Sequence, residues 1–266
     1  MTRSLFPKTL NLVLILPLLT DLACTDVGSQ DPASQSTISR LAAVSENGKA
    51  VSSFLYNPDG SLKQASYMLP TSEGRGEDEL RFNYTYTAGR ISGCTSMFKS
   101  ATTDYQYHYN SKNQLESVSG SNNLDVHYKY NGNGKLSEEE VERTSSFYQR
   151  VVYTYSWNAN NVSKISEETY NSSYLQRRAE YLYSYGKEKN PEPAIPGRTL
   201  QNFLGFPGYW YSENNVVKVQ YHNHSGDESS TTILSYTYNA NKYPLKATVQ
   251  SNRDDWSGKV YTFQYK

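Results

Sequence analysis

The chain has 266 residues, 25 of them tyrosine, and 26 basic residues balance 26 acidic ones. No basic cluster stands out, which argues against nucleic acid and against an anionic lipid surface as partners. Because tyrosine is abundant and aliphatic residues are modest in number, apolar burial must come largely from amphipathic rings, and we expect partly wet faces.

Residues 1–23 are expected to form an export signal. The apolar run 10–19 follows a basic start and is too short to span a bilayer as a mature helix, but it suits a signal-peptide core. The tripeptide Leu22-Ala23-Cys24 after it resembles the lipobox of bacterial lipoproteins. That resemblance implies that Cys24 carries the lipid and becomes the mature N-terminus.

Asp21 and Leu22 depart from the lipobox pattern, which prefers a leucine three residues before the cysteine and a small residue two before it. Residues 24–36 have almost no apolar content and are predicted to be a flexible, lipidated tether. Residues 37–266 are predicted to form a single β-repeat domain. Cys94, in a strand-like stretch without a Cys/His constellation, is interpreted as a structural residue.

The best-formed unit of this domain is residues 234–249, which read as strand, turn and strand. Rings at Tyr236 and Tyr238 alternate with Ser235 and Thr237, a period of two that places the rings on one face. Related units recur about every 26 residues. Their rings nearest the turn are Tyr56, Tyr86, Tyr109, Tyr130, Trp157, Tyr185, Tyr211, Tyr238 and Tyr265.

This repeat predicts an all-β fold, an up-and-down antiparallel meander of about 16–18 strands. Such a meander forms a curled sheet or a porin-like barrel. Residues 186–210 interrupt it, because several prolines there forbid a central strand. We expect a loop in which Thr199 caps one short helical turn. Two interpretations stay open for this insertion: a lid or partial plug, or an apolar staple that closes a gap in the sheet.

Two hairpin sequences, Tyr56-Asn-Pro-Asp-Gly-Ser-Leu62 and Tyr130-Asn-Gly-Asn-Gly-Lys-Leu136, resemble YD repeats, the unit of RHS-type shell proteins. A second likeness rests on Asn190-Pro191, on the apolar stretch 200–206, on residues 214–219 and on residues 236–246.

These residues are similar to an uncharacterised family of bacterial cell-envelope lipoproteins with a porin-like fold, over residues 54–266. Lys242 stands where that family usually has glycine. The likeness implies the fold, a lipid anchor and an envelope location, on the periplasmic or surface side of the outer membrane. It implies no catalytic residue.

A barrel of this kind is expected to be soluble. In the strand that starts at Leu136, alternation would place Glu138, Glu140 and Glu142 on the same face as Leu136. Glu139 and Arg143 would then lie on the opposite face. Neither face could then meet lipid, where a charge costs about 2–4 kcal/mol at the midplane.

Metal and cofactor sites are not predicted. His222 and His224 share a strand face, but their spacing is weak evidence for a metal pair, and an exposed strand end or loop is the preferred interpretation. His108 and His127, on the face opposite the rings, are expected to be exposed, and the glutamates of residues 138–142 are interpreted as a solvated face.

No local motif supplies a nucleophile with its base or a phosphate loop, so we do not expect an enzyme. The preferred hypothesis is a lipid-anchored envelope protein with a non-enzymatic binding or scaffolding role. A second hypothesis is a glycan-binding module, and a third is a carbohydrate-active enzyme with two carboxylates about 5–10 Å apart in a cleft. The rings that could stack on sugars are Tyr105, Tyr107, Tyr109, Tyr153, Tyr155, Trp157 and Trp210.

Overall fold

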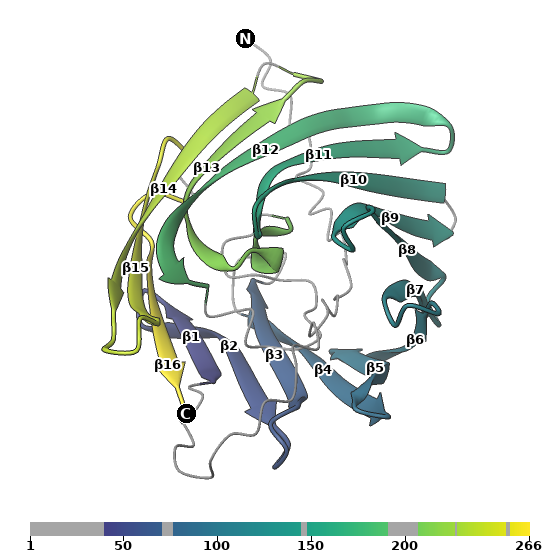
Figure 1. Cartoon of the computed structure of the whole chain (residues 1–266), viewed down its shortest axis with the longest axis horizontal. Helices are drawn as coiled ribbons and strands as arrows, with labels where there is room; N and C mark the ends of the chain where they lie inside the picture. Colours follow the sequence, from purple (N-terminus) through teal and green to yellow (C-terminus); the bar gives the residue numbers. More distant parts are fainter. Residues whose placement is uncertain (1–39, 71–76, 145–147, 191–206, 227, 254–255) are drawn as a thin grey trace.

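A computed structural model describes residues 40–70, 77–144, 148–190, 207–226, 228–253 and 256–266. Within them, 16 antiparallel strands follow one another round a closed barrel in which β1 pairs with β16 (Figure 1). The predicted all-β meander is therefore confirmed, and the sheet is closed. No helix among the described residues is long and apolar enough to cross a membrane.

The first eight strands are β1 (Leu41–Glu46), β2 (Lys49–Tyr56), β3 (Leu62–Pro70), β4 (Glu77–Thr87), β5 (Arg90–Phe98), β6 (Ala101–Tyr109), β7 (Leu115–Gly120) and β8 (Leu124–Tyr130). The second eight are β9 (Leu136–Thr144), β10 (Tyr148–Asn158), β11 (Asn161–Asn171), β12 (Tyr174–Lys189), β13 (Asn214–Asn223), β14 (Glu228–Tyr238), β15 (Pro244–Ser251) and β16 (Val260–Tyr265).

The predicted insertion is shorter than expected among the described residues, because residues 186–189 continue β12. A single 3-10 turn, η2 (Tyr209–Tyr211), precedes β13. The helical turn expected at Thr199 lies outside the described residues.

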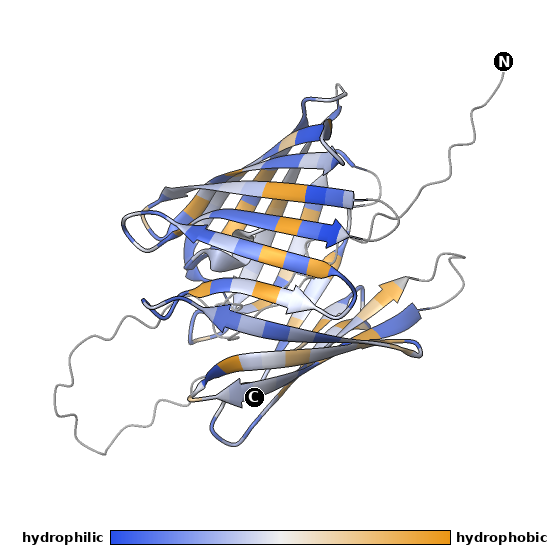
Figure 2. Ribbon diagram, turned by 90° about the vertical axis from the view of Figure 1, so that its right-hand side faces the viewer, coloured by the Kyte–Doolittle hydropathy of each residue, from blue (hydrophilic) through white to orange (hydrophobic). Residues whose placement is uncertain are grey.

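Alternation of side chains separates the interior of the barrel from its outer surface. In β10, Val151, Tyr153 and Tyr155 are buried, whereas Thr154 and Ser156, which alternate with them, are exposed. The buried apolar side chains of all strands form one core cluster inside the wall. Figure 2 shows the same alternation of apolar and polar residues along the strands. The tyrosine face is therefore the lumenal face.

Asparagine side chains build several of the hairpin turns. In the turn between β8 and β9, the Asn131 side-chain oxygen accepts hydrogen bonds from the backbone N–H groups of Asn133, at 2.9 Å, and Lys135, at 3.0 Å. Asn239 does the same between β14 and β15. Lys242 there has φ +68°, the left-handed conformation that Gly134 adopts at φ +77° in the equivalent turn. Lysine thus replaces the usual glycine without changing the turn.

A β-bulge follows each of these turns. In the hairpin of β4 and β5, Tyr86 faces Ile91 but Thr85 faces Gly93, which leaves Ser92 as an extra residue. The same shift occurs in six further hairpins, so the alternation of each return strand changes phase within its first few residues. The extra residues are Lys63, Ser92, Glu116, Ser137, Ser163, Val217 and Leu245.

The bulge at Ser137 corrects one sequence prediction. Leu136 is buried and does not share a face with Glu138, because the extra residue moves everything after it to the opposite phase. Glu139 and Val141 are buried on the lumenal face, while the glutamates at 138, 140 and 142 lie on the outside.

An aromatic side chain from the next strand reaches the carbonyl group beside each bulge. The Tyr86 hydroxyl on β4, for example, donates a hydrogen bond of 2.8 Å to the carbonyl oxygen of Leu62, the first residue of β3. Among the described residues eight such bonds of 2.7–2.9 Å connect successive hairpins round the whole barrel. We call the eight donors the aromatic belt: Tyr56, Tyr86, Tyr109, Tyr130, Trp157, Tyr185, Tyr236 and Tyr265.

The repeated rings of the sequence correspond to the aromatic belt, except at two positions. Tyr211 does not belong to a strand but lies in η2. In β14 the donor is Tyr236, whose hydroxyl reaches the Val216 carbonyl oxygen at 2.9 Å, and not Tyr238, which lies two residues closer to the turn.

The belt bonds are expected to contribute to stability individually. Tyr86→Phe should lower the free energy of unfolding by about 1 kcal/mol, because it removes a buried hydrogen bond and leaves the Leu62 carbonyl without this donor. Urea unfolding measures the change. Tyr174→Phe is the matched control, since that ring is 74% exposed, and an equal effect of the two substitutions would contradict the role assigned to the belt.

Candidate functional site

A short stretch of chain, residues 207–213, enters the barrel lumen; we call it the lumenal segment. Gly208, its second residue, has φ +66° and lies against the wall. A Cβ atom at this position would be 2.4 Å from Ile165 Cδ1 and 2.7 Å from Tyr155 Cε1, so glycine alone fits. Figure 1 places η2 of this segment within the ring of strands.

The C-terminal end of the lumenal segment is fixed to the aromatic belt. Ser212 Oγ accepts a hydrogen bond from the Val162 backbone N–H at 3.0 Å and donates one to the Tyr185 hydroxyl at 2.7 Å. The Glu213 N–H donates to the carbonyl oxygen of Asn160 at 3.1 Å. Tyr185 thus serves both the belt and the segment, because its own hydroxyl donates to the Val162 carbonyl oxygen.

The middle of the segment covers a buried carboxyl group. Glu139 on β9 is 0% exposed, and its Oε2 accepts hydrogen bonds from the hydroxyls of Tyr155, at 2.9 Å, and Tyr211, at 3.3 Å. Its other oxygen, Oε1, has no hydrogen-bond partner among the described residues. Burial raises the pKa of Glu139 to about 7, against the smaller lowering effect of the two hydroxyls. Glu139 is therefore an acid that titrates near neutrality.

A second lumenal carboxyl group belongs to the same row of the sheet. Tyr153 on β10 pairs with Glu139 on one side and with Glu167 of β11 on the other. Two strand spacings separate the backbones of the two glutamates, which is about 10 Å. Their side chains sit in different electrostatic environments.

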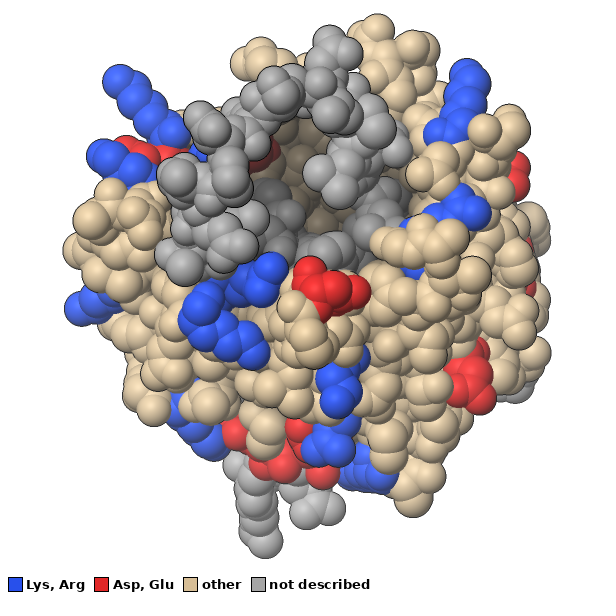
Figure 3. All heavy atoms as spheres, turned by 60° about the horizontal axis from the view of Figure 1, so that its bottom comes forward, with Lys and Arg blue, Asp and Glu red and all other residues tan. Residues whose placement is uncertain are grey.

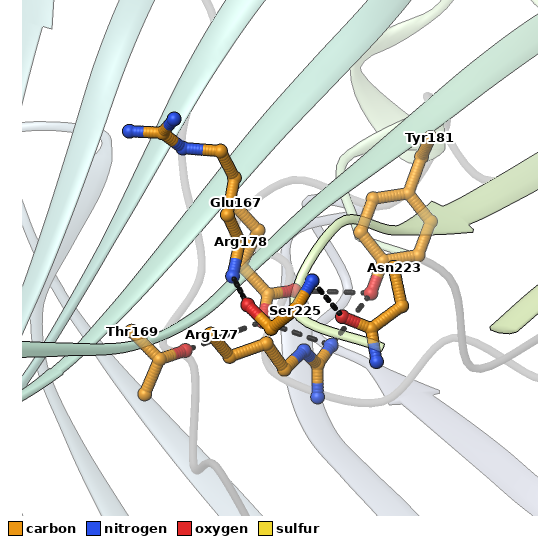
Figure 4. A network of polar contacts seen from close by, with 7 residues as sticks. All are labelled: Glu167, Thr169, Arg177, Arg178, Tyr181, Asn223 and Ser225. Carbon is orange, nitrogen blue, oxygen red and sulfur yellow. Dashed lines mark hydrogen bonds and ion pairs between the residues drawn. The ribbon is translucent and has the colours of Figure 1, made fainter. Parts of the chain in front are cut away.

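Glu167 is neutralised by a neighbouring cation. Its carboxylate lies 2.9 Å from Arg177 Nη2 and accepts a hydrogen bond of 3.0 Å from the Tyr181 hydroxyl (Figure 4). Arg177 also donates to that hydroxyl at 3.3 Å, and the Tyr181 ring packs 5.2 Å from the ring of Tyr221. Glu167 is thus paired as an ion, whereas Glu139 has only neutral hydroxyl donors.

Sequence reasoning missed both lumenal glutamates. Glu139 is one member of a run of acidic residues, and only the bulge at Ser137 decides which members face inward. The signal that could have revealed them is a glutamate two residues away from a buried apolar residue of the same strand, as Glu139 is from Val141 and Glu167 is from Ile165.

The rings predicted to stack on sugars lie inside the barrel. Tyr105, Tyr107, Tyr153, Tyr155 and Trp210 are buried, and Tyr109 and Trp157 are partly buried members of the belt. The structure brings Tyr155 and Trp210 to the same place, where their rings lie 5.6 and 5.5 Å from the ring of Tyr211. The β6 rings lie elsewhere on the wall. The predicted lipidation residue Cys24 lies outside the described residues.

The histidines are on the outer face, as expected for His108 and His127, which flank Ser117 in one row. His222 is opposite Glu180, and His224 Nε2 lies 3.4 Å from a carboxylate oxygen of the same glutamate. The described residues contain no group of three or more side chains suited to a metal ion. Cys94 is buried in β5, and burial raises the pKa of its thiol.

Comparison with known proteins gives a fold and no family. No family model matches the chain, and no curated protein matches it. A porin-like protein from Bacteroides uniformis is similar in structure, with a TM-score of 0.51 and 14% identity over 81% of this chain and 89% of that one. Another from Bacteroides vulgatus has a TM-score of 0.49 and 10% identity over 85% and 99%. The first likeness shows that the chain has a porin-like barrel fold.

Glu139 is expected to make stability depend on pH. Its pKa rises from 4.5 to about 7 on folding, so its contribution is fully present below about pH 4.5 and is lost as pH rises through 7. The full effect is on the order of 3 kcal/mol. Glu139→Gln keeps an acceptor for both tyrosines but cannot ionise, so the fall in unfolding free energy between pH 5 and pH 8 should shrink. Glu116→Gln, at an exposed bulge residue, should retain the wild-type fall, and identical pH profiles for all three proteins would refute the assignment.

Gly208→Ala is expected to displace the lumenal segment. The added methyl group meets Ile165 and Tyr155 and also strains the backbone at φ +66°, so unfolding free energy should fall by about 1–3 kcal/mol. Gly132→Ala is the control, because nothing lies within 4 Å of a Cβ atom there. Equal stability of the two variants would show that the segment does not pack as described.

Proposed function

We propose that this protein is a lipid-anchored component of the bacterial cell envelope. Its barrel stands in water rather than in the bilayer, and it has a non-enzymatic binding or scaffolding role. Three observations support the proposal: the charged outer wall, the polar groups inside the lumen, and the N-terminal sequence.

The outer wall carries the argument for an aqueous barrel. Facing strands from β8 to β12 bear ion pairs on their outer face, among them Lys129 with Glu138 at 2.6 Å and Arg150 with Glu140 at 3.1 Å. Arg178 with Glu168 continues the series on β11 and β12 at 2.6 Å. Figure 3 shows Lys and Arg side chains beside Asp and Glu side chains on the surface.

Lipid would be a poor solvent for this surface. A charged side chain on the lipid-facing side of a barrel costs about 2–4 kcal/mol near the midplane, and ion pairs on several adjacent strands multiply that cost. A membrane-spanning barrel also turns its apolar residues outward, whereas here the tyrosine and aliphatic core is inside the wall.

The envelope location rests on the sequence and on the fold. The apolar run 10–19 and Cys24 have the order of a lipoprotein signal, and the porin-like fold accords with a cell-envelope protein. Membership of the uncharacterised lipoprotein family, with its YD-like hairpins, is part of the same proposal.

A binding role without catalysis fits the lumen. A carbohydrate-active enzyme would need two carboxyl groups facing one open cleft. Glu139 instead is covered by Tyr211, and Glu167 is paired with Arg177. A glycan that stacked on the predicted rings would have to enter the lumen, since these rings are buried or partly buried inside the wall.

The anchor and the aqueous barrel can be tested together. Radioactive palmitate should label the wild type and Cys94→Ala, and both should sediment with membranes. Cys24→Ala should be unlabelled and should remain a folded, detergent-free protein in the aqueous fraction. Labelled Cys24→Ala protein would refute the anchor, and an unlabelled protein that needs detergent would refute the aqueous barrel.

A further inference from the structure

One carboxyl oxygen connects the barrel wall to the lumenal segment. Glu139 Oε2 accepts hydrogen bonds from Tyr155 on the wall and Tyr211 on the segment, and the two rings meet edge to face at 5.6 Å. Tyr211 thereby covers the carboxyl group, while Glu139 Oε1 points to no donor among the described residues. The lumenal segment therefore packs on a carboxyl group whose second oxygen accepts no hydrogen bond from the described residues.

No charge compensates this acid. The groups around it are phenols: Tyr128 on β8, Tyr153 and Tyr155 on β10, and Tyr211 on the segment. Their pKa values are raised by burial, so they stay neutral across the physiological range. The lumenal ion pair of Glu167 with Arg177 lies on the far side of Tyr153 in the same row. An ionised Glu139 would therefore be a buried carboxylate with no counter-ion.

The other hydrogen bonds that hold the lumenal segment do not involve Glu139. At its C-terminal end Ser212 is hydrogen-bonded to Val162 of β11 and to the Tyr185 hydroxyl. Glu213 is hydrogen-bonded through its backbone N–H and its carboxylate to Asn160, in the turn between β10 and β11. At its start the carbonyl oxygen of Pro207 accepts a bond of 2.6 Å from the Tyr183 hydroxyl. Between these points the segment rests on ring contacts and on Glu139.

We propose that Glu139 is a proton-controlled latch for the lumenal segment. With its proton the carboxyl group keeps Trp210 and Tyr211 seated against the wall. When the proton is lost to solvent, the carboxylate gains hydration only if these two side chains lift away, which opens the lumen above Glu139. The latch goes beyond the proposed envelope role and does not depend on the lipid anchor.

Hydrogen exchange of the full-length mature protein tests the latch. Backbone amides of residues 209–213 are followed by mass spectrometry between pH 5.5 and pH 8.5, with rates corrected for the intrinsic effect of pH. Between pH 5.5 and the folded pKa of about 7, each pH unit should raise the open fraction, and so the corrected rate, about tenfold. The rise should level off above pH 7, where Glu139 is ionised in both states. Amides of β8 in the same samples should show no such change, which separates local opening from global unfolding.

Two variants complete the experiment. Glu139→Gln should keep the segment protected at every pH, whereas Glu167→Gln should retain the wild-type response. A corrected wild-type rate that does not change with pH would overturn the proposal, even if Glu139→Gln failed to fold. A response that persists in folded Glu139→Gln would overturn it as well.

Discussion

The hydrogen bond from an aromatic side chain to the carbonyl group beside a β-bulge is the interaction on which the barrel depends. Each bulge removes one residue from the ladder and leaves a buried carbonyl that needs a donor. A tyrosine or tryptophan on the next strand supplies that donor while its ring fills the lumen. Each bond joins one hairpin to the preceding one, from Tyr56 to Tyr265, so the series connects neighbouring hairpins round the whole wall.

A lumen built from phenols can hold carboxyl groups that an aliphatic core would exclude. Glu139 and Glu167 occupy the same row and each accepts a tyrosine hydroxyl, yet only Glu167 has a cation beside it. That one difference gives the two acids opposite characters, one paired as an ion and one titrating near neutrality. The lumenal segment joins both features of the fold, because it covers Glu139 through Tyr211 and attaches to the belt through Tyr185.

Most of the fold was predictable from local pattern. Rings alternating with hydroxyl residues and asparagine-based turns indicated antiparallel hairpins. Of the four glutamates expected on a solvated face, those at 138, 140 and 142 lie outside, whereas Glu139 is buried. The candidate site was not predictable, because it depends on the phase of each return strand after its bulge. One extra residue, Ser137, separates Leu136 from Glu138 and turns Glu139 inward. The rings expected to meet ligands lie inside the wall, as core residues or as donors of the aromatic belt.

The sequence by itself determined the type of strand, the length of the repeat and the composition of the two faces, because these depend on side-chain alternation and turn chemistry within a few residues. Only the tertiary structure decided that the meander closes, that β1 meets β16, and that Tyr211 lies over a glutamate 72 residues away. Closure requires the register shifts of every hairpin to be mutually consistent, and the latch arises where distant segments meet inside the closed wall. Neither property resides in any single stretch of chain.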